Sequence, residues 1–563
     1  MMFGKKAAPK EPIESNTDKD SERVSKLTEI LKRRQKPQAQ RKEYPKFTVL
    51  PQKIIPLEVG VKEAVYPLLR PYAYASIKYD PKEGALIYSV IEPQLSDEER
   101  KFLARIKEGL IQILDVSLSA IKNEDATLEL LEKKIHYLIA QFKIAVSDDQ
   151  YLRMMYYIYR DFVGLNELEP LLRDPYIEDI SCDGTAVPMY VVHQRFGQLK
   201  TNVSIQPVEY LKEFVVKLSE RCDRYVSYAE PLLDGSLPDG TRIQASLASD
   251  VTTHGPTFSI RKFREKPFTP IDQFNLKTAD MDMLAYLWFL IEHGANILVC
   301  GATATGKTSF LNSLAFFMPP TAKVVSIEDT REINIYHENW LPAVARVGFV
   351  GTHVGEVTMY DLLKEAFRQN PNYLIVGEVR GEEAAVMFQA MASGITSMST
   401  MHAGSIEDAL KRLQTRPISL PPTLLETLDA VIIMSHAVEK GASARRVRNI
   451  IEVGSVDPET ARVKYTTAYE WNPVKDVFTH DKDSIALRRI SEEKGIALSE
   501  ITKELEQRKH VLQWLAAQPL DWKAVSEYII LYYRDHEAVL KLMAETKIAE
   551  KKAKPVGTKQ KKE

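Results

Sequence analysis

The stretch that most constrains the fold runs from residue 297 to 309, ILVCGATATGKTS. Its first four residues are apolar, as in a strand of a parallel sheet that is covered on both faces. The pattern G-x-x-x-x-G-K-[ST] of a phosphate-binding loop then begins at Gly301 and ends at Thr308. The run FLNSLAFF follows as a predicted helix, so strand, glycine-rich turn and helix come in the order that such a loop requires.

The chemistry of this loop predicts ATP and Mg²⁺ as ligands. Glycines let the backbone direct successive N–H groups inward, and the amino end of the helix that begins near Lys307 adds to this anion cradle. Lys307 supplies a charge for the β- and γ-phosphates, and the Thr308 hydroxyl can ligate Mg²⁺. The residues expected to bind the nucleotide are Gly301, Ala302, Thr303, Ala304, Thr305, Gly306, Lys307, Thr308 and Ser309.

The length predicts several domains, because the 563 residues exceed the roughly 250–300 that one hydrophobic core usually serves. Strands and helices alternate from residue 271 to about 455, which is typical of an α/β protein with a parallel sheet. The predicted parts are a disordered charged tail (1–45), a small sheet with a helical subdomain (46–172), a small α/β lobe (173–270), the nucleotide-binding core (271–482), a C-terminal helical segment (483–545) and a basic tail (546–563).

Local patterns give finer predictions. Residues 80–84 predict a hairpin turn between two strands, and Ser96 followed by Glu99 predicts a capping box at the start of a helix. Residues 269–270, a Thr-Pro pair, indicate a linker between the lobe and the core. The Leu/Ile/Tyr stripes of residues 483–545 indicate packed helices, with a docking surface for another protein as the alternative.

The cysteines and the apolar segments of the sequence indicate the cellular compartment. The three cysteines are far apart and include no C-x-x-C pair, which argues against a zinc site or a disulfide scaffold and fits a reducing cytosol. Residues 1–45 lack the apolar core of a signal peptide, and the most apolar run, 283–300, is broken by Glu292 and His293. We therefore expect a cytoplasmic protein whose contact with the cytoplasmic membrane is peripheral.

The net charge of −2 conceals basic ends. Residues 1–45 hold 12 Lys/Arg against 7 Asp/Glu, and residues 543–563 hold 7 against 3, which leaves the body at about −11. Such tails are usually disordered and solvated. The more specific alternative is that they bind electrostatically to an anionic membrane surface or an acidic partner. A nucleic-acid translocase would more commonly have a basic body, so we expect no nucleic acid as a partner.

Three further strand ends of the core carry polar side chains. The apolar run that ends at Ile327 is followed by Glu328, the run LIVG by Glu378, and the run that ends at Met401 by His402. Ligands of parallel sheets bind beyond the carboxyl ends of the strands, so we expect these side chains to gather beside the phosphate loop. The plainer interpretations are a surface acid, a helix cap and a core histidine, respectively.

Four motifs in a fixed order carry a resemblance to a known superfamily. GATATGKTS, SIEDTRE, LIVGEVRGEE and STMHAGS match the Walker A, Asp box, Walker B and His box of the secretion ATPase superfamily. This superfamily serves type II secretion, type IV pilus assembly and the archaellum. The form IEDTRE and the segments PYIEDISCDG and GPTFSIRKFREKPFTPIDQF are similar to its archaeal branch, most of all to the archaellum motor ATPase. The resemblance extends from about residue 160 to 540.

The resemblance implies a RecA-like P-loop NTPase core preceded by a smaller α/β plus helical N-terminal domain. It also implies a homohexamer that acts on a polytopic membrane platform protein, together with other motor accessory proteins. Glu328 would be the catalytic glutamate, Glu378 would coordinate Mg²⁺ or its water, and His402 would sense the γ-phosphate. Arg242 and Arg261 match positions that supply arginines to the nucleotide on lobe closure, with ordinary surface arginines as the alternative. Weaker candidates for such a role are Arg264, Arg368 and Arg380.

The sequence thus predicts a Mg-ATP-hydrolysing hexameric motor for archaellum or pilus-like filament assembly or for protein secretion. A hexameric nucleic-acid translocase remains an alternative, and it would bind DNA or RNA with a strong salt dependence. A non-catalytic nucleotide-binding scaffold is a third class, which the presence of both Glu328 and Glu378 disfavours.

Overall fold

The computed structural model describes residues 44–553 except 53–54, 56, 58–60, 115–123, 347, 349–353, 440–441, 458, 461 and 482. The tail predicted to be disordered, residues 1–45, lies almost wholly outside the described residues. The basic tail predicted from residue 546 begins inside the last helix, which continues to Ala553. The chain divides into two compact units, residues 1–50 with 93–163, and residues 51–92 with 164–563.

The first unit is helical. Its helices pack Leu103, Ile106 and Leu110 of α2 and Leu131 of α3 into a small core. The predicted capping box is confirmed, because Ser96 caps α2 and Glu99 bonds back to the cap. The elements of this unit are α2 (Asp97–Ile113), α3 (Glu124–Phe142), α4 (Asp148–Ile158) and a π-helical turn, η2 (Tyr159–Val163).

The second unit begins with a nine-stranded sheet in the order β1-β2-β3-β6-β5-β4-β9-β8-β7. The hairpin predicted at residues 80–84 is confirmed, since β2 and β3 pair antiparallel on either side of it. Strands β1–β3 fall in the first predicted subdomain, yet β3 pairs with β6 of the predicted lobe, so the two parts share one sheet. The strands are β1 (Ala64–Leu69), β2 (Ala73–Asp80), β3 (Ala85–Ile91), β4 (Ile177–Cys182), β5 (Tyr190–His193), β6 (Gly197–Thr201), β7 (Leu232–Ser236), β8 (Arg242–Ser246) and β9 (Thr257–Arg261), with α5 (Glu169–Leu172) and α6 (Val208–Arg221) between them.

The core contains a second nine-stranded sheet, in the order β12-β11-β13-β14-β10-β15-β16-β17-β18. Its first six strands run parallel, and β16, β17 and β18 continue it as an antiparallel meander. The α/β fold class predicted from the alternating pattern is confirmed. The strands are β10 (Ile297–Gly301), β11 (Val324–Glu328), β12 (Trp340–Val344), β13 (Tyr373–Val376), β14 (Thr396–Met401), β15 (Ala430–Glu439), β16 (Ala442–Val456), β17 (Val463–Asn472) and β18 (Val477–His480).

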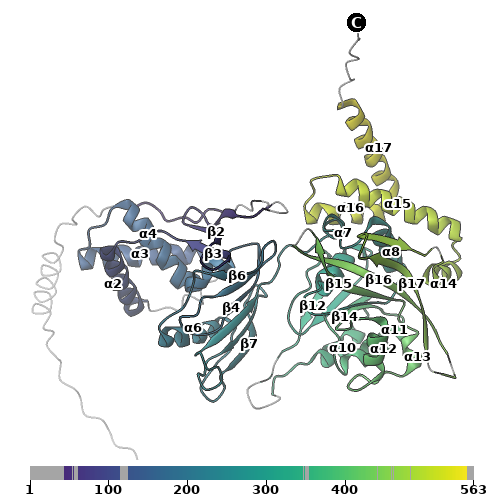
Figure 1. Cartoon of the computed structure of the whole chain (residues 1–563), viewed down its shortest axis with the longest axis horizontal. Coiled ribbons are helices and arrows are strands. Elements are labelled where there is room, and N and C mark those ends of the chain that lie inside the picture. Colours follow the sequence, from purple (N-terminus) through teal and green to yellow (C-terminus); the bar gives the residue numbers. More distant parts are fainter. Residues whose placement is uncertain are drawn as a thin grey trace, which may run out of the picture. The chain divides into compact units, whose positions relative to one another are not determined.

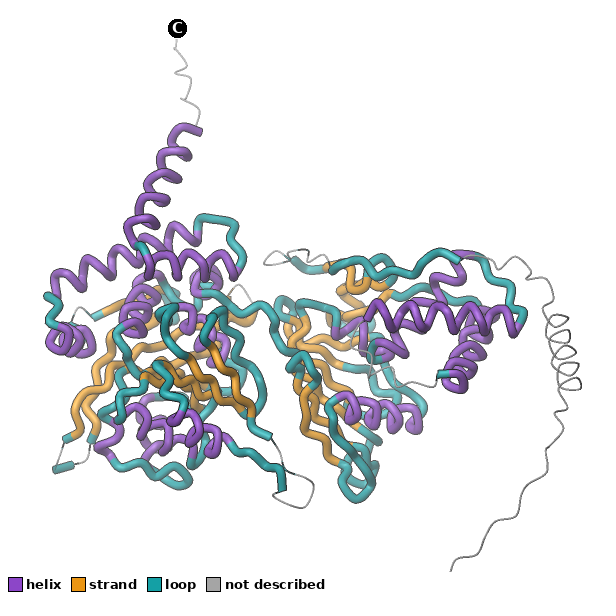
Figure 2. The backbone as a smooth tube through the Cα atoms, turned by 180° about the vertical axis from the view of Figure 1, so that it is seen from behind, coloured by secondary structure: helices purple, strands orange, loops and turns teal. Residues whose placement is uncertain are grey.

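Helices cover both faces of the core sheet, as Figures 1 and 2 show. Alternate residues of β10 explain why: Ile297 and Val299 enter one hydrophobic cluster, whereas Leu298 and Cys300 enter the other. The strand is buried on both sides, which accounts for its unbroken apolar run. The helices of the core are α7 (Pro270–Asn275), α8 (Met281–Glu292), α9 (Lys307–Leu314), α10 (Met359–Arg368), α11 (Glu383–Ala392), α12 (Ile406–Gln414) and α13 (Pro422–Leu425).

Residues 269–270, predicted to be a linker, form the start of α7. Thr269 is 3% exposed and caps α7 by accepting a hydrogen bond from the backbone N–H of Asp272, while Pro270 occupies the first helical position. A Thr-Pro pair suits a helix start as well as it suits a linker, because proline lacks the N–H that would be left unpaired there.

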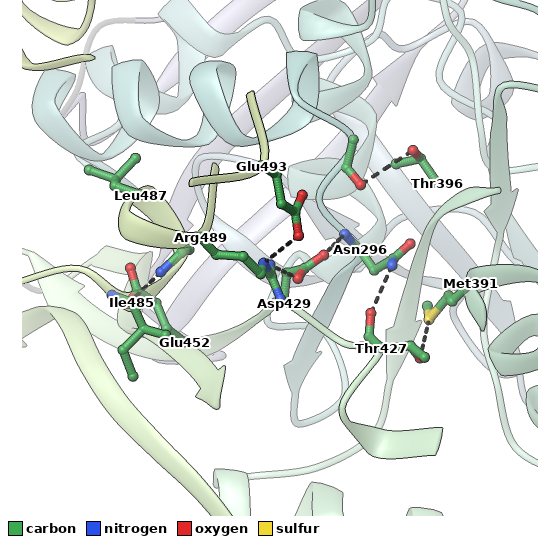
Figure 3. Close-up of polar contacts among 12 residues, drawn as sticks. Asn296, Met391, Thr396, Thr427, Asp429, Glu452, Ile485, Leu487, Arg489 and Glu493 are labelled. Atoms are coloured by element: carbon green, nitrogen blue, oxygen red, sulfur yellow. Dashed lines mark hydrogen bonds and ion pairs between the residues drawn. The ribbon is translucent and has the colours of Figure 1, made fainter. Parts of the chain in front are cut away.

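The C-terminal helical segment begins at the amino edge of the sheet, where Figure 3 shows its polar contacts. The buried carboxylate of Glu452 on β16 accepts hydrogen bonds from the Ile485 backbone N–H at 2.6 Å and from the Ser484 hydroxyl at 2.5 Å. Arg489 pairs with Asp429, which directly precedes β15. The helices are α14 (Ile485–Lys494), α15 (Leu498–Ala516), α16 (Trp522–Arg534) and α17 (His536–Ala553), and their predicted stripes lie in the core, with Val511, Leu512, Leu515 and Ile529 buried.

One asparagine at the same edge connects the starts of three parallel strands, and Figure 3 shows its contacts with Asp429 and Thr427. Asn296 precedes β10, and its backbone N–H donates to Asp429 at 2.6 Å. Its side-chain Nδ2 donates to the Thr427 carbonyl at 2.7 Å, and its Oδ1 accepts from the Ser397 N–H of β14 at 2.8 Å. These contacts hold β14, β10 and β15 in register.

Candidate functional site

The phosphate loop connects β10 and α9 as the sequence predicts. β10 is buried along its whole length and lies between β14 and β15, and α9 begins at Lys307. Gly306 stands at the N-cap of α9 and offers no capping side chain. The first backbone N–H groups of the helix are therefore available to an anion.

Two glycines of the loop are required by the backbone. Gly306 has a φ of 87°, in the left-handed region, and a Cβ there would lie 3.0 Å from Cδ of Arg445. At Gly301 a Cβ would lie 2.5 Å from the Thr305 hydroxyl oxygen and 2.8 Å from the Met434 carbonyl oxygen. Strand β15 thus runs so close to the loop that only a hydrogen fits at Gly301.

Lys307 bends back over the loop from the first turn of α9. It is 8% exposed, and its Nζ donates to the Ala302 carbonyl at 3.1 Å and lies 3.3 Å from His402 Nδ1. Burial lowers the pKa of Lys307, and the Glu378 carboxylate opposes that shift. Its amine therefore lies in a partly desolvated position, where a phosphate charge would interact with it strongly.

Strands β13 and β14, which are parallel neighbours, bring Glu378 and His402 to Lys307. His402 Nε2 lies 3.1 Å from Glu378 Oε1, the distance of an ion pair, but the contact lacks hydrogen-bond geometry. The other Glu378 oxygen accepts from Arg380 Nη2 at 2.5 Å. Burial lowers the pKa of His402 and the Glu378 carboxylate raises it, and the net shift is a lowering.

Glu328 lies at the end of β11, beside the Gly377 backbone of the next strand. It is 1% exposed, and its Oε1 accepts the backbone N–H groups of Glu332 and Ile333, each at 2.8 Å. A Cβ at Gly377 would lie 3.1 Å from Glu328 Cγ, which places this carboxyl next to the Glu378 segment. Burial raises the pKa of Glu328 to about 7, against the lowering effect of the two backbone bonds.

Two buried carboxylate oxygens at this edge could accept a bound cation or its water. Glu328 Oε2 and Glu378 Oε1 accept no hydrogen bond, although Glu378 Oε1 faces His402 Nε2 at 3.1 Å. A buried carboxylate oxygen without a hydrogen bond is costly unless a ligand completes it. Within the described residues no group of three His, Cys, Asp or Glu side chains could hold a metal by itself. Mg²⁺ usually takes one or two protein ligands together with phosphate and water, and the half-buried Thr308 hydroxyl is a candidate for one of them.

The two arginines predicted to reach the nucleotide lie side by side on the first sheet of this unit. Arg242 of β8 and Arg261 of β9 are direct partners across the ladder. Arg242 pairs with Asp234 at 3.0 Å, and Arg261 pairs with Asp179 at 3.0 Å. In the described part of the chain, neither arginine makes a hydrogen bond or ion pair with the phosphate loop. The weaker candidates contact Phe268 (Arg264), Glu365 (Arg368) and Glu378 (Arg380).

Two further residues at the loop were not predicted from the sequence. His436 of β15 lies with Nε2 3.2 Å from the Thr303 carbonyl oxygen, and Arg445 of β16 donates from Nε to the Ala304 carbonyl at 3.1 Å. Both lie far along the chain from the four motifs. The pairing of β15 with β10, and of β16 with β15, brings them to the loop.

The parallel sheet and this loop define a P-loop nucleotide-binding protein of the α/β class. A family model described as "Type II/IV secretion system protein" matches residues 195–474. The uncharacterized protein MJ0900 of Methanocaldococcus jannaschii is 35% identical over 473 residues, which cover 79% of this chain and 85% of that protein. The type IV secretion system protein PtlH of Bordetella pertussis is 30% identical over 43% of this chain and 80% of its own length.

The chain therefore belongs to the type II/IV secretion system protein family, as the motif order predicted. Among solved structures, the ATPase DotB of Legionella pneumophila is 14% identical, covers 66% of this chain and 95% of its own, and superposes with a TM-score of 0.38. No helix in the described part of the chain combines the length and the apolar character needed to cross a bilayer.

Proposed function

We propose that this protein is a Mg-ATP-hydrolysing motor of a secretion or filament-assembly machine. The observation that carries the proposal is the meeting of Lys307, at the start of α9, with Glu378 and His402, which follow β13 and β14, at one edge of the core sheet. Membership of the secretion family supports it. An ATPase needs these three kinds of group together: a cation for phosphate, a carboxylate for Mg²⁺ or its water, and a polar group near the terminal phosphate.

In the proposed cycle Lys307 and the amides of residues 301–309 bind the phosphates. Mg²⁺, when bound, would neutralise phosphate charge, and Thr308 and Glu378 are the residues proposed to hold it or its water. Glu328 would orient the attacking water through its unpaired Oε2, and its raised pKa suits proton acceptance near neutral pH. His402 would report on the γ-phosphate.

Arg242 and Arg261 are proposed to join the nucleotide when the lobe closes. Their cross-strand pairing supports a joint action, because one movement of the sheet would deliver both guanidinium groups. Each would have to exchange its carboxylate partner for phosphate, which offers a more concentrated negative charge.

The wider setting is also proposed. We propose a homohexamer at the cytoplasmic membrane, bound to a polytopic platform protein and motor accessory proteins, with the basic tails at the anionic membrane surface. The IEDTRE form of the Asp box supports the archaeal branch. Within that branch we propose the archaellum motor, with a pilus or secretion engine as the alternatives.

The test is ATP turnover by the purified chain with Mg²⁺ and with EDTA. We expect Mg-dependent hydrolysis that Lys307→Ala reduces at least about 100-fold, since the phosphate charge then loses its main cation. Lys503→Ala is the matched control, because Lys503 is an exposed lysine of α15. Turnover that survives Lys307→Ala refutes the proposed site. Stimulation by DNA, but not by anionic vesicles, would favour the nucleic-acid translocase.

A further inference from the structure

The β15–β16 hairpin extends past the carboxyl edge of the core sheet and touches the phosphate loop. His436 and Arg445 are direct partners across its two strands, so both side chains leave the same face. They contact consecutive carbonyl groups, those of Thr303 and Ala304, at 3.2 and 3.1 Å. A carbonyl oxygen can only accept, so His436 Nε2 carries the hydrogen in this contact.

Through the geometry of the peptide bond, these two contacts orient two backbone N–H groups of the loop. In a trans peptide the C=O and the following N–H point in opposite directions. A Thr303 carbonyl held toward the hairpin therefore directs the Ala304 N–H away from it, and the Ala304 carbonyl does the same for the Thr305 N–H. These two amides belong to the anion cradle. Ala304 also has a φ of 61°, which costs a residue with a side chain some energy, so an external restraint is useful there.

The opposite face of the hairpin is fixed by the neighbouring residue. Arg446 is 1% exposed, and it binds both oxygens of Asp476 at 2.9 and 3.0 Å and Glu439 at 3.0 Å. It also donates to the Leu276 carbonyl at 3.2 Å. Because successive residues of a strand point to opposite faces, Arg446 anchors the hairpin while Arg445 faces the loop.

We propose that His436 and Arg445 form a hairpin clamp, a pair of positioning residues that hold the phosphate loop in its anion-binding conformation. The clamp rests on the proposed function and deepens it. It acts on the binding of the phosphate groups, not on the chemical step, because it contacts loop carbonyls and leaves the amides to the ligand.

The test compares Arg445→Ala and His436→Ala with Arg448→Ala, an exposed arginine of the same strand, in the full chain. The probes are ADP and inorganic pyrophosphate by calorimetry, and MgATP turnover. We expect Arg445→Ala to weaken the binding of both probes and to raise KM by about 3–10-fold, with kcat changed less than about twofold. This is the effect expected from the loss of one partly exposed charge-assisted hydrogen bond. His436→Ala should have a smaller effect, and Arg445→Lys should recover part of the loss, since an ammonium can still donate to Ala304.

Three results would contradict the hairpin clamp and leave the proposed function intact. Arg445→Ala could behave like Arg448→Ala, or it could lower kcat at unchanged KM. It could also weaken the binding of ADP without weakening the binding of pyrophosphate, which would place Arg445 at the nucleoside. Failure of the proposed function looks different: the unmodified chain would then bind neither probe, or Lys307→Ala would bind them equally well.

Discussion

Replacing Gly301 by alanine tests whether the contact of β15 with the phosphate loop is as close as described. The added methyl would lie 2.8 Å from the Met434 carbonyl oxygen and 2.5 Å from the Thr305 hydroxyl. Carbon in van der Waals contact needs about 3.5 Å, so strand or loop has to move. Thr305 has little room, because it is 1% exposed and its hydroxyl donates to the Ala302 carbonyl at 2.8 Å.

The expected cost is that of overpacking a tight core, about 1–3 kcal/mol. For a domain of this size the melting temperature falls by about 2–4 °C for each kcal/mol. Because Ala302 and Thr305 belong to the cradle, ADP should stabilise the variant less than it stabilises the unmodified chain. Thermal unfolding with and without ADP measures both effects.

Gly404→Ala is the matched control. Gly404 also follows a strand of the core at the same edge, in the STMHAGS motif, but a Cβ there would meet no heavy atom within 4 Å. We expect its melting temperature to stay within about 2 °C of the unmodified chain, as is usual for surface changes. Equal behaviour of the two variants, in stability and in ADP response, would refute the reasoning from crowding.

Two further predictions concern buried polar groups. The pKa of Glu328 is raised from 4.5 to about 7, so unfolding is coupled to proton release, and stability should fall by about 3 kcal/mol as pH rises from about 4.5 to 7. Glu328→Gln should remove that fall in denaturant titrations, and a slope like that of the unmodified chain would contradict the assignment. Asn296→Ala should cost about 2–4 kcal/mol, because the Ser397 N–H and the Thr427 carbonyl lose their partner. Urea unfolding measures this loss of stability, with Asn339→Ala, at an exposed asparagine, as the control. Equal unfolding midpoints for the two variants would contradict the prediction.

Features set by neighbouring residues could be predicted from the sequence. The strand before the loop, the capping box at Ser96 and the hairpin at residues 80–84 each depend on a few adjacent side chains. The meeting of Lys307, Glu378 and His402 followed from a general rule, that parallel strands end at one edge.

Features set by strand pairing could not be predicted. The partnership of Arg242 with Arg261 depends on the register of β8 with β9, and the contacts of His436 and Arg445 depend on β15 lying beside β10. Nothing local in the sequence distinguishes these residues from other polar residues of exposed strands. Tertiary pairing, not propensity, decides such positions.

Strand β16 reaches from one functional edge of the core to the other. Arg445 near its start touches the phosphate loop, and Glu452 further along holds the first turn of α14. The two residues are seven positions apart, about 24 Å of extended chain. One strand therefore connects the phosphate-loop edge of the core to the C-terminal helices, and its pairing register shifts twice on the way, at Val447–Asn449 and at Ile450–Ile451.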